Sequence, residues 1–428
     1  MLRNLSAAPL KPPQRMQILK VHLLPKLDHR LALSAINKGL LRRLDRMVRR
    51  EVIRCLHLPR RGVPLEFFHS PVMYGGLGVR SYAGTMVDIN DRRLNLLIWN
   101  NHPYAKWLVS DSHWSQRWRD RTEDRTVVEN NDQNEPVAAE NENVRDTRRK
   151  GDDSTRYKPH KEDPNLIDLY EKCGYVGLKW QPHVPQSSLW IDCWKRRLHI
   201  TGWDYTKAIL ARGSLMATPA RKARIGLTAS PNCPTCPAWI GTAAHCLQSC
   251  PRTHGARIAR HDYVLDHLVR SLRHRDSEVK VLLAPRIPAG QSHVEPDVVF
   301  WFPSAFPRVA YCVDAAVCSE ECNPNSLHET KVRKYDQPEV SSWIKRHSGM
   351  TTVEYGSVVL TWRGTWSASS ANWLTEFPRQ FLRHRDLAIM SLRTLIGSWK
   401  CWAAWQAHAG GRPDANRNRH DFRNRQPP

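Results

Sequence analysis

Apolar residues recur at helical spacing in the first sixty residues of the chain. From Asn37 onward a single apolar stripe is separated by arginines; its members are Leu40, Leu41, Leu44, Met47, Val48, Val52 and Cys55. This spacing predicts an amphipathic helix that packs along one face. An earlier helix is predicted over 13–33 with a kink near Pro25, because proline removes a backbone donor from the helix.

A different pattern governs the C-terminal part of the chain. Short apolar runs at 294–302, 308–314 and 353–362 predict three strands, and the stretch around 328–335 predicts a helix. The first two runs are close enough to form a hairpin. The prediction is therefore an α+β chain with helices first and a sheet near the end.

Composition divides the chain of 428 residues further. Such a length favours two or three domains. Residues 116–163 and 409–428 are polar and poor in apolar residues, so we expect a disordered linker and tail there. The remaining parts are a helical domain over 1–115, a basic helical region over 164–232, a metal-binding segment over 233–262 and a mixed α/β domain over 263–408.

The net charge of the chain indicates the kind of partner that it binds. The chain has 65 Lys and Arg against 41 Asp and Glu, a formal charge of +24, which favours a nucleic acid. The face of the 37–55 helix is rich in guanidinium groups that suit phosphate, namely Arg42, Arg43, Arg46, Arg49 and Arg50. The alternative is an ordinary solvated helix face.

Membrane and secreted classes are not favoured. No run approaches the roughly 20 apolar residues that span a bilayer. The first residues lack the apolar core of a signal peptide, so we expect reduced cysteines and no membrane partner. A nuclear location, or more narrowly a nucleolar one, is the expectation.

A metal-binding motif lies in the middle of the chain. Cys233, Cys236, His245 and Cys250 follow the pattern C-x2-C-x8-H-x4-C. Three thiolates and one imidazole complete a tetrahedral zinc site with no open position, so the zinc would be structural. His254 is a spare ligand, and a chance cluster of core thiols is the alternative.

Both flanks of this motif are basic. Arg221 and Arg224 precede it, and Arg252, Arg257 and Arg260 follow it. We expect these five residues to bind nucleic acid beside the metal segment.

Two acids in the predicted hairpin suit phosphodiester hydrolysis. Asp297 precedes the first strand and Asp314 ends the second, so both could hold Mg²⁺. Lys331 on the following helix would orient water or neutralise the transition state, with Tyr335 one turn further and Lys334 as the alternative lysine. A hairpin with ordinary edge acids is the competing interpretation.

Together these motifs resemble the restriction-like-endonuclease class of non-LTR retrotransposons, typified by the R-two elements. APLKPPQRMQILKVHLLPKLDH and LLRRLDRMVRREVIRCLHLP look like the reverse-transcriptase thumb, and FFHSPVMYGGLGV resembles the motif that follows it. TPARKARIG and CPTCPAWIGTAAHCLQSCPRTHGARIARHD resemble the basic run and zinc knuckle. EPDVVF, VAYCVD and KVRKY resemble the endonuclease.

The resemblance implies the C-terminal half of such a polyprotein. It implies a thumb-like helical bundle, a zinc knuckle and a PD-(D/E)xK endonuclease that nicks target DNA for target-primed reverse transcription of the element RNA. No Tyr/Phe-x-Asp-Asp motif occurs, so we expect no reverse-transcriptase activity from this chain alone. The alternative is a catalytically decayed nucleic-acid-binding remnant, because Glu295 stands where a basic residue commonly precedes Pro-Asp.

Overall fold

The computed structural model describes residues 2–31, 38–85, 99, 103, 183–195 and 197–409. The predicted linker and tail therefore lie outside the described residues, apart from Ala409. The chain forms two compact units: one combines 1–25, 46–80 and 164–428, and the other combines 26–45 and 81–163. No described helix is long and apolar enough to cross a membrane.

The N-terminal region is helical, as the apolar spacing predicts. It begins with α1 (Leu2–Ala7) and α2 (Pro12–Gln17), which continues through a π-helical turn, η1 (Ile18–Leu23), into α3 (Leu24–Leu31). The π turn ends just before Pro25, where the missing backbone donor interrupts the regular ladder. The helix predicted over 13–33 is present as far as Leu31, and the irregularity within it is this π turn; the predicted kink near Pro25 stays a prediction.

The arginine-rich helix is also confirmed, as α4 (Lys38–Cys55). Leu41, Val48, Val52 and Cys55 of its predicted stripe are buried, whereas Leu40 and Met47 are about half exposed. The buried stripe is thus narrower than the sequence suggests.

A compact turn follows α4. It contains α5 (Leu65–His69) and the 3₁₀ turn η2 (Val72–Tyr74), which ends at Gly75 with φ 96°. At Gly76 a Cβ atom would lie 2.2 Å from the carbonyl oxygen of Ser70. Only glycine fits this close backbone approach.

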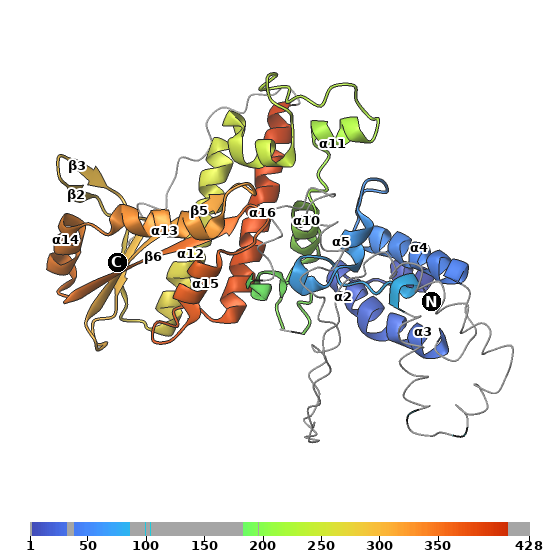
Figure 1. Cartoon of the computed structure of the whole chain (residues 1–428), viewed down its shortest axis with the longest axis horizontal. Coiled ribbons are helices and arrows are strands. Elements are labelled where there is room, and N and C mark those ends of the chain that lie inside the picture. Colours follow the sequence, from blue (N-terminus) through green and yellow to red (C-terminus); the bar gives the residue numbers. More distant parts are fainter. Residues whose placement is uncertain are drawn as a thin grey trace, which may run out of the picture. The chain divides into compact units, whose positions relative to one another are not determined.

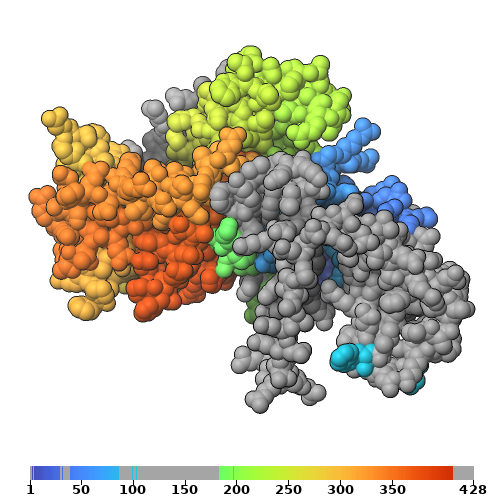
Figure 2. All heavy atoms as spheres, viewed as in Figure 1, coloured from blue at the N-terminus to red at the C-terminus, as the bar shows by residue number. Residues whose placement is uncertain are grey.

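Short helices lead to the metal segment. These are η6 (Pro185–Ser188), α10 (Gly202–Arg212), α11 (Pro219–Arg224), η7 (His245–Ser249) and η8 (Pro251–Thr253). Thr201 and Thr218 cap α10 and α11 by accepting backbone N–H groups of Asp204 and Arg221. The segment 215–260 gathers in one lobe, coloured green to yellow in Figure 2.

The C-terminal region contains a four-stranded sheet in the order β1-β4-β5-β6 (Figure 1). The strands are β1 (Lys280–Leu283), β4 (Val298–Trp301), β5 (Val309–Cys318) and β6 (Thr352–Thr361). β4 pairs antiparallel with β5, and β5 pairs parallel with β6. The hairpin β2 (Ile287–Ala289) and β3 (Ser292–Val294) forms a second, small sheet.

Helices cover both faces of the larger sheet. They are α12 (His254–Arg275), α13 (Pro324–Tyr335), α14 (Pro338–Ser348), α15 (Ala368–Thr375) and α16 (His384–Ala409). Val298 and Phe300 pack with α12, α15 and α16, whereas the alternate residue Val299 packs with α13 and α14. α12 continues through residue 262, so one helix joins the metal segment to this α/β region.

Candidate functional site

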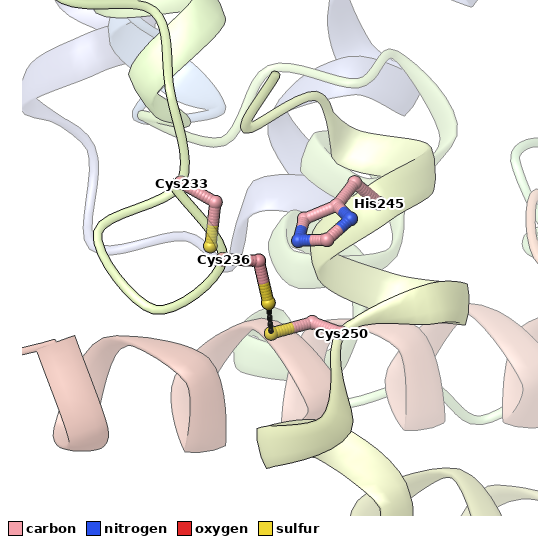
Figure 3. A group of neighbouring side chains, drawn as sticks. All are labelled: Cys233, Cys236, His245 and Cys250. Atoms are coloured by element: carbon pink, nitrogen blue, oxygen red, sulfur yellow. Dashed lines mark hydrogen bonds between the residues drawn. The ribbon is translucent and has the colours of Figure 1, made fainter. Parts of the chain in front are cut away.

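The four predicted metal ligands converge on one point (Figure 3). Cys233 and Cys236 come from a tight turn, His245 from η7, and Cys250 from the residue after it. Their ligand atoms all lie within 4.8 Å of one another, and the Sγ atoms of Cys236 and Cys250 are 4.0 Å apart. The group can hold a metal ion such as zinc.

The chemistry of His245 and Cys233 fits a metal, whereas burial raises the pKa of the Cys250 thiol in the absence of a cation. Both ring nitrogens of His245 are buried with no hydrogen-bond partner among the described residues, and burial lowers the pKa of the ring, which keeps it neutral. Burial opposes ionisation of Cys233, but backbone N–H groups of Thr235 and Cys236 lower the pKa of its thiol below the usual range. A neutral imidazole and an acidic thiol are the forms that bind metal.

The metal-binding cluster packs against aromatic side chains. The indole of Trp239 stacks on His245 with ring centroids 6.2 Å apart. Cys233, Cys246 and Cys250 are buried in a small core with Trp402 and Trp405 of α16. Cys246 is outside the ligand group, and burial raises the pKa of its thiol, as suits a core residue.

The second predicted site forms around two acids of the larger sheet: Asp297 precedes β4 as predicted, whereas Asp314 lies within β5, which continues to Cys318 instead of ending at Asp314. Val298 pairs with Val313 in the antiparallel register, so the residues one step further, Asp297 and Asp314, face each other across the hairpin. Each carboxyl group is close enough to affect the pKa of the other, and Asp297 Oδ2 accepts the backbone N–H of Ala315 at 2.7 Å. The predicted proximity of the two carboxylates is therefore present in the structure.

The C-terminal half of α13 supplies the other predicted side chains. Lys331 Nζ lies 2.5 Å from Asp314 Oδ2, and Tyr335 donates its hydroxyl to Asp314 Oδ1 at 3.2 Å and to the Glu295 carbonyl at 3.0 Å. Lys334, the alternative lysine, donates to the Tyr335 hydroxyl at 2.9 Å. Lys331, not Lys334, is the lysine in contact with a carboxylate.

The two carboxyl groups differ in acidity. Burial and the adjacent Asp297 raise the pKa of Asp314 above the usual range. Burial also disfavours ionised Asp297, but hydrogen bonds from His261, Asp314 and Ala315 lower its pKa. The adjacent Asp297 thus opposes ionisation of Asp314, a repulsion that a divalent cation can relieve.

His261, which no sequence motif singled out, completes this site. Its Nε2 lies 3.1 Å from Asp297 Oδ2 and its Nδ1 lies 3.3 Å from Asp262 Oδ1. Burial alone would lower the pKa of His261, but these hydrogen bonds raise it to about 10. The Arg-His-Asp run on α12 could have marked His261 as a candidate in the sequence. Its position beside the β4–β5 hairpin, however, depends on how α12 packs in the tertiary structure.

A buried polar network holds α13 beside the acids. His328 Nδ1 lies 2.7 Å from Ser357 Oγ and 3.0 Å from Ser370 Oγ. Ser357 pairs with Asp314 across β5 and β6. Because Lys331 follows His328 by one helical turn, this network fixes the segment that carries the lysine.

The predicted nucleic-acid residues occupy two kinds of environment. Exposed members are Arg42, Arg43, Arg46, Arg50, Arg224 and Arg252, while Arg49 and Arg257 are partly buried. Arg221 is buried and donates to the carbonyl groups of Leu215, Arg61 and Gly62. Arg260 is 2% exposed. Contact of these ten residues with nucleic acid stays a prediction.

Glu295 lies at the edge of the carboxylate site. Its side chain is 45% exposed and its Oε1 is 3.7 Å from His293 Nε2 and 3.9 Å from Arg286 Nε. These neighbours offset part of the negative charge that Glu295 adds beside Asp297.

The relatives of this chain are retrotransposon polyproteins. The chain is 28% identical over 410 residues to the retrovirus-related Pol polyprotein from type-2 retrotransposable element R2DM of Drosophila melanogaster, a match that covers 96% of the chain. It is 24% identical over 423 residues to the R2 Pol polyprotein of Nasonia vitripennis and 26% identical over 374 residues to one of Popillia japonica. No protein-family model matches the chain.

The predicted resemblance is confirmed: the chain is homologous over nearly its whole length to a region of R2-type non-LTR retrotransposon Pol polyproteins. It spans about a third of the first two relatives, 35% of each, and 54% of the Popillia japonica protein named above.

Proposed function

We propose that this chain is a metal-dependent DNA endonuclease region of an R2-type element that nicks target DNA for target-primed reverse transcription. The observation that carries the proposal is the convergence of Asp297, Asp314 and Lys331 beside the β4–β5 pair. A mixed sheet with an antiparallel β4–β5 pair, a parallel β5–β6 pair and helices on both faces supports a restriction-endonuclease-like fold.

The residues fit a hard divalent cation such as Mg²⁺. Asp297 and Asp314 would hold it through carboxylate oxygens, the ligands that Mg²⁺ prefers. When bound, the ion lowers the pKa of a coordinated water and offsets charge on the phosphate. The elevated pKa of Asp314 supports this fit, since a cation relieves the repulsion between the two acids.

The protein side chains then have separate roles. Lys331 stabilises the negative charge that develops on the phosphate and orients the attacking water. Tyr335 keeps Asp314 oriented by donating to its Oδ1, and His261 does the same for Asp297 Oδ2. His328 positions Lys331 through the network with Ser357 and Ser370.

Two further parts of the proposal concern zinc and nucleic acid. Cys233, Cys236, His245 and Cys250 would hold one structural Zn²⁺, since all four positions are filled by the protein. The basic surfaces would bind the DNA target and the element RNA, in keeping with the +24 charge. The proposed location is the nucleus, where such a target lies.

A nicking assay tests the catalytic proposal. The whole chain with Mg²⁺ should convert supercoiled plasmid to the open circle, and Asp297→Asn should abolish nicking while DNA affinity changes little. Glu329→Gln is the matched control, because Glu329 is 61% exposed on the same helix as Lys331 and pairs only weakly with Arg333 at 3.6 Å. Nicking that survives loss of both Asp297 and Asp314 would refute the assignment.

The second candidate is a decayed remnant that binds nucleic acid without cutting it. Glu295 favours this candidate, because it adds negative charge where phosphate must approach. If the whole chain does not nick with Mg²⁺ or Mn²⁺, Glu295→Lys should restore nicking. A Glu295→Lys variant that still does not nick DNA would support the decayed-remnant candidate.

A further inference from the structure

A small cavity joins the metal segment to the carboxylate site. It has a volume of about 280 Å³ and is lined by Gln248, His254, Arg257, Ile258, Arg260, His261 and Val317. His261 belongs both to this lining and to the contact with Asp297. The cavity therefore adjoins the proposed catalytic acids.

Arg260 gives this cavity a positive charge that the protein does not balance. The side chain is 2% exposed, and its guanidinium donates only to neutral groups, Ser398 Oγ at 3.0 Å and Gln248 Oε1. Its Nε has no partner, and no acidic residue in the described ranges forms an ion pair with it. A buried unpaired cation is costly, so an anion in the cavity would stabilise it.

Arg257 adds a second guanidinium of the same kind. Its one described hydrogen bond is to the backbone carbonyl of Gln248, and its Nε is buried without a partner. Gln248 belongs to the same lining, where its amide donates to the Val317 carbonyl and accepts from Arg260. The two arginines thus supply positive charge to the lining, and guanidinium groups match phosphate geometry.

We propose that this cavity is a phosphate subsite for the nucleic-acid strand, next to the phosphate that reaches Asp297 and Asp314. The proposal rests on the proposed function for the identity of the strand. Its geometric basis is independent of cleavage: two guanidinium groups without carboxylate partners line one cavity.

The test measures binding of a fluorescein-labelled thymidine octanucleotide by anisotropy, with zinc-loaded whole chain and no Mg²⁺. Arg257→Gln should weaken binding about tenfold, the usual effect of removing one charge-assisted hydrogen bond. Arg273→Gln, which removes the same charge from an exposed position of α12, should change affinity less than about twofold. Equal effects of the two variants would overturn the subsite.

A second variant covers the case in which Arg257→Gln misfolds. Ile258 is 50% exposed and lines the cavity, so Ile258→Glu places a negative charge at its rim, whereas Ile258→Gln is the neutral control. We expect Ile258→Glu alone to weaken binding about tenfold. No difference between the two Ile258 variants would contradict the proposal.

Arginine labelling distinguishes the sources of phosphate. Phenylglyoxal modification of Arg257, read by mass spectrometry, should be slowed by the octanucleotide and not by an equal concentration of inorganic phosphate, while Arg273 stays reactive. Protection by inorganic phosphate alone would make the cavity a free-anion site and overturn the strand assignment. These assays measure binding and labelling and do not depend on cleavage. They therefore test the subsite even if the chain has no nuclease activity.

Discussion

At the scale of single residues, the carboxylate site depends on close contacts that no single residue reveals. Asp297 and Asp314 are ordinary acids in the sequence, but the hairpin register sets them opposite each other. Burial and the adjacent Asp297 raise the pKa of Asp314, and Lys331 at 2.5 Å offsets part of the negative charge. In the proposed function, this site would take a cation and a phosphate.

The role of Lys331 gives the first prediction. Lys331→Ala should slow nicking about 10²–10³-fold, the usual cost of removing one transition-state donor, with little change in DNA affinity. Lys334→Ala should have a much smaller effect, because Lys334 contacts Tyr335 and not a carboxylate. Rates of plasmid nicking for the two variants decide between the lysines, and a larger reduction for Lys334→Ala would reverse the assignment.

The second prediction concerns His261 and pH. Its pKa is raised from 6.5 to about 10, so its contribution to stability is complete below about pH 6.5 and is lost as pH rises toward 10. The difference in melting temperature between the chain and His261→Gln should therefore be greatest near pH 6 and vanish near pH 10. Thermal unfolding without divalent ions measures it. A difference that grows with pH would show that His261 is not held by Asp297.

Local motifs were predictable, and contacts set by tertiary packing were not. The four metal ligands lie within 18 residues, so their spacing alone predicted the cluster. His261 lies 36 residues from Asp297, and its role depends on where α12 crosses the hairpin. In the sequence, Arg221 and Arg260 resembled surface cations, but both side chains are buried in the structure. The long aliphatic part of an arginine side chain can pack among apolar residues, so sequence alone does not show whether an arginine is exposed.

At the scale of elements, the metal segment is too short to fold by itself. Its turns have few apolar residues of their own and pack on Trp402 and Trp405 of α16. Helical spacing of apolar residues predicted α4, short apolar runs predicted β4, β5 and β6, and the stretch around 328–335 predicted the C-terminal part of α13. The sequence did not predict the π turn in 18–23 or the extent of α16, which depend on packing.

The third prediction is loss of metal on changing one ligand. Cys236→Ser should release zinc and lower the melting temperature by about 6–12 °C, since loss of ~3 kcal/mol shifts it by that amount in a domain of this size. Cys322→Ser is the matched control, because Cys322 is exposed and outside the ligand group. Elemental analysis and thermal unfolding measure both effects. Full zinc content in Cys236→Ser would refute the site.

At the scale of the whole molecule, positive charge and the proposed catalysis are separate properties. The chain has 65 basic and 41 acidic residues, whereas the proposed catalytic groups lie beside one pair of strands, β4 and β5. Binding and cutting can therefore be lost independently. This separation explains how a related chain could keep its affinity for nucleic acid after its nuclease had decayed.

The last prediction tests where this charge acts. If the exposed face of α4 binds phosphate, replacing Arg42, Arg46 and Arg49 by Ala should weaken binding to all duplex sequences alike. The slope of log affinity against log salt should become shallower by about 0.9 for each phosphate that the variant no longer neutralises. Replacement of the same residues by Lys should keep most of the slope, because the charges remain. Titrations from about 50 to about 200 mM salt, the range over which such slopes are steep, measure it. An unchanged slope in the Ala variant would make this surface a solvated helix face and would leave the basic flanks of the metal segment to carry the affinity.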